Sequence, residues 1–141
     1  MSLFKKLVLL GLLLSISVLA LAQTASSPKS DPSVEAFWTK FKAAVQKSDK
    51  ASVAAMSQFP IEMSYGVPKI RNRTQLNRRW SELFKDQADA VKCFADAKPS
   101  MDDRNHFSIW CKDEGGNEVL RYFFARTRTG WKLLFLDNIN E

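Results

Sequence analysis

The sequence predicts an α+β domain in which N-terminal helices pack against an antiparallel sheet built mainly from the C-terminal half. Two observations support this fold class. Apolar residues over 32–47 recur with spacings of three and four, which is the period of an amphipathic helix. From residue 106 onward, long apolar runs are separated by two short turn signals, Gly115-Gly116 and Thr129-Gly130. Helices followed by hairpin-connected strands are typical of an α+β domain.

The composition narrows the classes of partner. The 141 residues include 21 Lys and Arg against 15 Asp and Glu, so the formal net charge is +6. This excess suits acidic partners without requiring them. The sequence contains no nucleic-acid recognition motif, no metal-ligand cluster and no phosphate-binding loop. We therefore expect no nucleic-acid partner, no metal and no cofactor.

Residues 1–22 have the order of a secretory signal peptide. Lys5 and Lys6 form a short positive region, an apolar run follows, and Ala20-Leu21-Ala22 is a small-x-small site of the kind that signal peptidase cleaves. We predict cleavage after Ala22 and export to the periplasm or the medium. The alternative is a retained membrane anchor. The run is short for a spanning helix and no charged stop follows it, so we expect no stable membrane span after cleavage.

Two helices are predicted next. Residues 23–31 are rich in small polar side chains and predict a flexible leader. Asp31 then precedes a proline, which is typical of a helix cap followed by the first helical position. The first helix is predicted over 32–47, and its apolar stripe consists of Val34, Phe37, Trp38, Phe41 and Val45. Asp49 is positioned to cap a short second helix over 50–57.

Short elements are predicted up to residue 85. Pro60 ends the second helix, because the residue before a proline avoids helical backbone. Alternating apolar residues predict a strand over 61–65, and 69–71 is suited to a short edge strand. A third helix is predicted over 75–85, with Thr74 as its cap, and its apolar face consists of Leu76, Trp80, Leu83 and Phe84.

The remaining chain predicts strands. Residues 91–97 are predicted as a strand, although their alanines would also suit a helix, and 99–104 is polar and turn-like. Better strands are predicted over 106–112, 118–128 and 131–136. The last two carry large apolar residues on both faces, and such strands are covered on both faces. The helices can cover one face, and the other needs a curved sheet or a second subunit. A twofold homodimer through the sheet would provide such a cover.

Several short segments, taken in order, resemble a known fold. They are Phe37-Trp38 in the first helix, 47–50, 59–61, 70–73 and the closing Gly-Trp-Lys-Leu-Leu of 130–134. Together they resemble the nuclear transport factor two-like superfamily, also called the cystatin-like α+β cone. The resemblance implies one cone-like domain over 32–141, with a strongly bent antiparallel sheet around a long helix and a cavity at its wide end. The superfamily includes isomerases, dehydratases, polyketide cyclases and non-catalytic binding proteins, so the fold does not choose a function.

The two cysteines, Cys93 and Cys111, are predicted to form a disulfide. If 91–97 and 106–112 pair as an antiparallel hairpin, the two cysteines face each other within disulfide reach. Export would supply an oxidising compartment. Two buried free thiols are the alternative. A catalytic cysteine is disfavoured, because nothing places the single histidine, His106, beside either sulfur.

Six further residues are candidate contacts for a ligand or partner. Lys69, Arg71 and Arg73 alternate along one face and make the densest basic patch, which suits an anionic ligand, an acidic partner or a solvated sheet edge. His106 shares a strand face with Trp110 and suits either an acid-base group in the cone mouth or an exposed strand start. Tyr65 is a candidate by residue type only.

The favoured function is an exported, non-catalytic domain that binds a small apolar molecule or a partner protein. The alternative is an isomerase or dehydratase type of enzyme, whose cavity would hold an acid-base pair. Such an enzyme needs an enclosed pocket with at least two converging polar groups. A binding module instead shows an apolar pocket, or a filled cone with an apolar outer patch. A third reading is an inhibitor or immunity-type protein that uses the basic patch.

Overall fold

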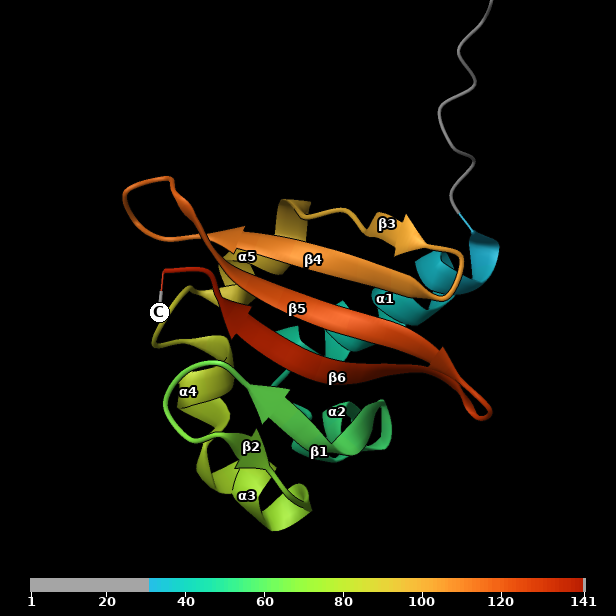
Figure 1. Cartoon of the computed structure of the whole chain (residues 1–141), viewed down its shortest axis with the longest axis horizontal. Helices are drawn as coiled ribbons and strands as arrows, with labels where there is room; N and C mark the ends of the chain where they lie inside the picture. The colour runs from blue at the N-terminus through green and yellow to red at the C-terminus, as the bar shows by residue number, and fades with distance from the viewer. Residues whose placement is uncertain (1–30, 141) are drawn as a thin grey trace, which may run out of the picture.

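In the computed structural model, which describes residues 31–140, a long helix lies behind one six-stranded sheet (Figure 1). The predicted fold class is confirmed, since helices pack against a single sheet. We call the side of the sheet that the helices cover the inner face, and the opposite side the outer face. The predicted signal peptide over 1–22 and nearly all of the predicted leader lie outside the described residues.

Asp31 begins the first helix as predicted. Its carboxylate accepts a hydrogen bond from the Ser33 N–H at 2.8 Å, which satisfies one of the unpaired amides at the helix start. Helix α1 spans Pro32–Gln46. Its apolar stripe packs on the inner face, with Val34, Trp38, Phe41, Ala44 and Val45 buried.

Asp49 caps the second helix, α2 (Lys50–Ala55), by accepting a hydrogen bond from the Ser52 N–H at 3.1 Å. The chain then enters strand β1 (Ser57–Met63), which contains the cis peptide bond before Pro60. The second helix therefore ends earlier than predicted, and the strand that follows begins earlier.

The C-terminal strands follow the sequence closely. β4 spans His106–Lys112, β5 spans Glu118–Thr127 and β6 spans Gly130–Asn138. β4 pairs antiparallel with β5, and β5 pairs antiparallel with β6. The polar segment predicted as a turn over 99–104 instead contains strand β3 (Ser100–Asp103), whose four residues are all exposed at the sheet edge.

The order of strands in the sheet is β2-β1-β6-β5-β4-β3. Antiparallel pairing holds for every neighbouring pair except β1 and β6, which run parallel. β2 (Lys69–Ile70) pairs with the other side of β1, as the predicted edge strand. A hairpin turn fixes the direction of two consecutive strands, whereas β1 and β6 are distant in sequence, so no local signal indicated their parallel pairing.

The strand predicted over 91–97 is wrong, because this segment forms helix α5 (Ala90–Asp96). The Asp89 carboxylate caps it by accepting a hydrogen bond from the Lys92 N–H at 3.2 Å. Phe94 is fully buried and Val91 is 39% exposed, a pattern that suits a helical period and not an alternating strand. The alanines of the segment favour this outcome.

The third predicted helix is divided in two. α3 spans Arg73–Arg78 and α4 spans Trp80–Phe84, with a turn at Arg79 between them. The cap of α3 is Asn72 and not Thr74, because the Asn72 side chain accepts a hydrogen bond from the Gln75 N–H at 2.9 Å.

Aromatic rings fill the space between the helices and the inner face. The ring centroids of Phe107 and Phe124 lie 4.6 Å apart, those of Phe41 and Phe124 lie 5.0 Å apart, and those of Phe94 and Tyr122 lie 5.0 Å apart. All five side chains are completely buried. The interior that the resemblance offered as a cavity is thus occupied by the protein's own core.

Candidate functional site

The outer face carries an aromatic and charged group that we call the outer-face cluster: Trp110, Arg121, Phe123, Phe135 and Asp137. The strand register brings its members together, because Trp110 pairs with Arg121, and Arg121 pairs with Asp137 on the next strand. Phe123 pairs with Phe135 in the same way. Each member alternates with a core residue, as residues on opposite faces of a strand do.

Arg121 lies at the centre of the outer-face cluster. Its guanidinium carbon is 5.4 Å from the ring centroid of Trp110 and 5.6 Å from that of Phe123. Its Nη2 donates a hydrogen bond to Asp137 Oδ2 at 3.2 Å. Among the described residues, the buried Nε of Arg121 has no hydrogen-bond partner. The two charges offset one another, and the guanidinium is stacked between aromatic surfaces.

His106 extends the outer-face cluster along β4. Its ring stacks on Phe123, with centroids 5.2 Å apart and an interplanar angle of 17°. Its Nδ1 lies 2.7 Å from the carboxylate of Asp103. The pKa of Asp103 is held below its usual value, first by the hydrogen bond from the Asn105 N–H and next by the one from His106. His106 is therefore a half-exposed residue at a strand start, held by a ring and a carboxylate.

Within residues 31–140, no helix lies over this face. Figure 1 shows the sheet nearest the viewer, with α1, α2 and α5 behind it. Trp110, Phe123 and Phe135 are half-buried. Large aromatic residues beside an arginine, on an uncovered surface, are the composition that dominates binding energy at protein interfaces.

The two tyrosines have a structural role in helix α4. The Tyr65 hydroxyl donates to the Glu82 carbonyl at 3.2 Å, and the Tyr122 hydroxyl donates to the Leu83 carbonyl at 2.6 Å. These carbonyls belong to the last turn of a helix, where backbone acceptors have no partner within the helix. Burial raises the pKa of Tyr122 well above its usual value. Both phenols are thus engaged by the backbone.

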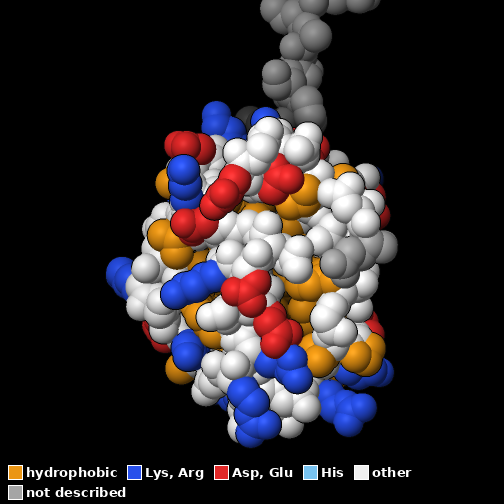
Figure 2. All heavy atoms as spheres, turned by 90° about the vertical axis from the view of Figure 1, so that its left-hand side faces the viewer, with side chains coloured by type: hydrophobic (Ala, Val, Ile, Leu, Met, Phe, Trp, Pro, Cys, Tyr) orange, Lys and Arg blue, Asp and Glu red, His pale blue; other side chains and the backbone are white. Residues whose placement is uncertain are grey.

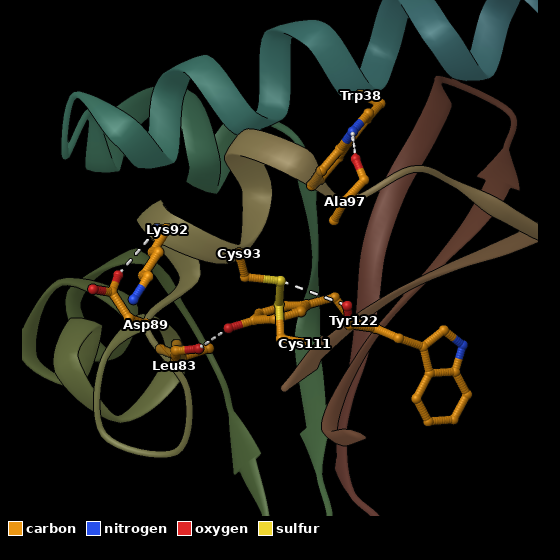
Figure 3. The surroundings of a disulfide bond; sticks show 9 residues. Trp38, Leu83, Asp89, Lys92, Cys93, Ala97, Cys111 and Tyr122 are labelled. Atoms are coloured by element: carbon orange, nitrogen blue, oxygen red, sulfur yellow. Dashed lines mark hydrogen bonds between the residues drawn. A yellow bond between two sulfur atoms is a disulfide. The ribbon is translucent and has the colours of Figure 1, made fainter. Parts of the chain in front are cut away.

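The disulfide between Cys93 and Cys111 is present, and it joins α5 to β4 with 5.6 Å between the Cα atoms (Figure 3). The predicted bond is confirmed, although the hairpin from which it was predicted is not, because Cys93 lies on a helix. The Trp38 indole N–H donates to the Ala97 carbonyl at 3.2 Å and holds the other end of the segment.

A groove of about 870 Å³ opens beside this disulfide. Its walls come from the loop before α5, from α5 itself and from the hairpin between β4 and β5. Charged side chains of both signs line it: Lys85, Asp86, Asp89, Lys92, Asp96, Lys112, Asp113 and Glu114. Figure 2 shows this side of the molecule, where acidic and basic side chains are interspersed with small apolar areas. The groove therefore mixes many charged side chains with a few apolar ones, whereas a pocket for a small apolar molecule is lined mainly by apolar side chains.

The structure separates the six candidate contact residues into three places. His106 and Trp110 lie on β4, Trp110 within the outer-face cluster and His106 next to it. Tyr65 is buried at α4. The three basic residues, Lys69, Arg71 and Arg73, lie at or just after β2. This strand forms one edge of the sheet, and β3, next to β4, forms the other edge. Sequence reasoning missed Arg121 and Phe135, which could have been found by following the outward positions of the two-faced strands.

By its fold, the described part of this chain is an α+β domain in which helices pack against one six-stranded sheet. No protein-family model matches the sequence, and no curated protein sequence matches it. Within residues 31–140, no helix is long and apolar enough to cross a membrane.

Solved structures with a similar fold come from several bacteria. A provisionally named dehydratase of the nuclear transport factor two-like family from Streptomyces avermitilis is 16% identical, over 74% of this chain and 91% of its own, with a TM-score of 0.44. A nuclear transport factor two-like protein with a cystatin-like fold from Novosphingobium aromaticivorans is 13% identical, over 75% and 78%, with a TM-score of 0.41. A provisionally named ketosteroid isomerase from Shewanella frigidimarina is 12% identical, over 76% and 94%, with a TM-score of 0.43. The names of the first two contain the superfamily that the sequence resembles, and the likeness concerns the fold alone.

Proposed function

We propose that this chain is a non-catalytic binding domain that holds a partner protein on the outer face of its sheet. The observation that carries the proposal is the contrast between the two sides of the sheet. The inner face is filled by rings that are completely buried, whereas no helix of the described part of the chain covers Trp110, Phe123 and Phe135 on the outer face. An uncovered aromatic cluster with a central arginine favours protein binding.

The filled interior also favours a protein partner over a small apolar molecule. A small apolar ligand binds in a concave pocket lined mainly by apolar side chains. The groove beside the disulfide is lined by charges, and the space inside the sheet is occupied by aromatic rings. The enzyme alternative draws no support from the tyrosines, since both hydroxyls donate to backbone carbonyls of α4. The disulfide is compatible with the predicted export.

The occupant we propose for the outer face is a second copy of the chain. The protein carries excess positive charge, so two copies repel one another unless they meet through a neutral surface. The outer-face cluster is such a surface, because Arg121 and Asp137 form an ion pair within it. A twofold contact places the same residues opposite each other, which aromatic side chains tolerate and unpaired charges do not.

Sedimentation equilibrium over a wide concentration range tests this proposal. The natural chain should form a dimer, and the double variant W110A/F123A should weaken the dimer at least about 100-fold, because two interface anchors are removed. The matched control is V91A/M101A, which removes two apolar side chains that are 39% and 37% exposed away from the cluster. The control should dimerise normally.

A natural chain that stays monomeric at every concentration would remove the second copy as the occupant. The same result would follow if the control variant weakened the dimer as much as the test variant does. A partner of another sequence would then be sought by whether the W110A/F123A change abolishes its binding.

A further inference from the structure

The segment 69–79 is strongly basic. It contains five Lys and Arg and no Asp or Glu, and it runs through β2 and α3 at one end of the molecule. Figure 2 shows Lys and Arg side chains projecting along the lower edge of the molecule, where Figure 1 places α3. We call Lys69, Arg71, Arg73 and Arg78 the basic end.

The basic end gathers arginines that have no ion pair with another described residue. Arg79 pairs with Glu82 at 2.7 Å, Arg121 pairs with Asp137, and Arg126 pairs with Asp31. Among residues 31–140, five exposed arginines have no carboxylate within ion-pair distance: Arg71, Arg73, Arg78, Arg104 and Arg128. The first three lie within eight consecutive residues of the basic end, whereas Arg104 and Arg128 stand apart from it in the sequence. The sequence has no Asp or Glu before Asp31.

The backbone beneath these arginines is held firmly. Ile70 and Leu76 are completely buried and anchor the two ends of the turn in the core. Between them, the Gln75 side chain accepts a hydrogen bond from the Arg71 N–H at 2.7 Å, and the Asn72 side chain accepts one from the Gln75 N–H. The guanidinium groups therefore project from an ordered scaffold, which lowers the entropy lost when they bind.

We propose that the basic end docks on an anionic phospholipid bilayer. Guanidinium groups match phosphate oxygens well, and cations near an anionic leaflet are attracted to it. The residues between the arginines are polar, Asn72, Thr74 and Asn77, and all are exposed. The segment has no large exposed apolar side chain, and the groove lies elsewhere, so contact with an extended charged surface is favoured over insertion or enclosure.

Vesicle co-sedimentation tests the proposal, with vesicles of phosphatidylglycerol and phosphatidylcholine compared with phosphatidylcholine alone. The natural chain should bind the anionic vesicles, and binding should fall steeply as salt is added. The triple variant R71Q/R73Q/R78Q should bind about 100-fold more weakly, at about five-fold for each cation removed. The matched control K40Q/R104Q/R128Q removes three exposed charges from other places and should lose less than about five-fold.

Two further measurements distinguish the alternatives. The variant R71K/R73K/R78K keeps the charges and should stay within about three-fold of the natural chain, since attraction to a charged plane depends on charge and not on the fork of the guanidinium. Equal losses in the test and control triples would overturn the proposal. Binding of soluble polyglutamate that is as tight as binding to the anionic vesicles would overturn it too and indicate an acidic protein. The outer-face variant W110A/F123A should bind vesicles normally, so this test is independent of the proposed function.

Discussion

Phe123 and Phe124 are neighbours on β5 and occupy opposite environments. Phe124 faces inward and its ring contacts Phe41, Phe107 and Trp38, so it is completely buried. Phe123 faces outward, stacks on His106 and remains half-buried. The same type of side chain is thus packed in the core on one face of the sheet and left partly exposed on the other. An apolar residue in a strand therefore predicts that its face of the sheet is covered, but it does not predict which element or partner covers it.

The largest effect should come from the inner face. F124A should lower the free energy of unfolding by about 3–5 kcal/mol, because it removes a ring from a filled core and leaves a cavity. F123A should cost less than about 1 kcal/mol in the same monomer, since its ring is partly exposed already. Urea unfolding at a protein concentration too low for dimers measures both. Equal losses would mean that the two faces do not differ as described.

The sequence predicted the inner face better than the outer one. The stripe of α1 and the hairpins of β4–β6 follow from local periods and turns, and these agree with the structure. The cysteines were paired correctly, but on the assumption that 91–97 is a strand of a hairpin, whereas it lies in helix α5. A segment with both alanines and alternating apolar residues fits the helix pattern as well as the strand pattern. Of the outer-face cluster, only Trp110 was recognised, together with His106 beside it. The other members lie beyond a register shift between Phe123 and Phe124, which the turn between β5 and β6 does not indicate.

The next effect concerns the connection between α5 and the inner face. Replacing both cysteines, as C93A/C111A, should lower the free energy of unfolding by about 3 kcal/mol, because the bond closes a loop with a sequence separation of 18. Denaturation in urea, with and without a thiol reductant, measures the loss. The reductant should destabilise the natural chain and leave the double variant unchanged. A double variant as stable as the natural chain would show that noncovalent contacts, such as the packing of Phe94, fix α5 without the bond.

A smaller effect should come from the tyrosines that bind the last turn of α4. Y122F should cost about 1–2 kcal/mol, because the buried Leu83 carbonyl loses its donor. Y65F should cost less, since its hydrogen bond is longer, 3.2 Å against 2.6 Å. Thermal unfolding of the two variants ranks them. If Y65F proved the more damaging, the assignment of Tyr122 as the main support of α4 would fail.

The smallest effect should be a loss of stability at low pH, which comes from carboxylates at the surface and not from the core or the outer-face cluster. No Asp or Glu is buried among residues 31–140, whereas four surface carboxylates have lowered pKa values: Asp31, Asp49, Asp103 and Asp113. The pKa of Asp49 is lowered mainly by the hydroxyl and then the N–H of Ser52. A carboxyl whose pKa is lower in the folded state stabilises the fold above its unfolded pKa and loses that contribution as the pH falls through the folded value. Stability should therefore decline below about pH 4.

D49N keeps the cap of α2 without the titrating group, so its thermal midpoint should change less between pH 5 and pH 2 than that of the natural chain. Parallel pH profiles for the two proteins would show that the acid sensitivity arises elsewhere.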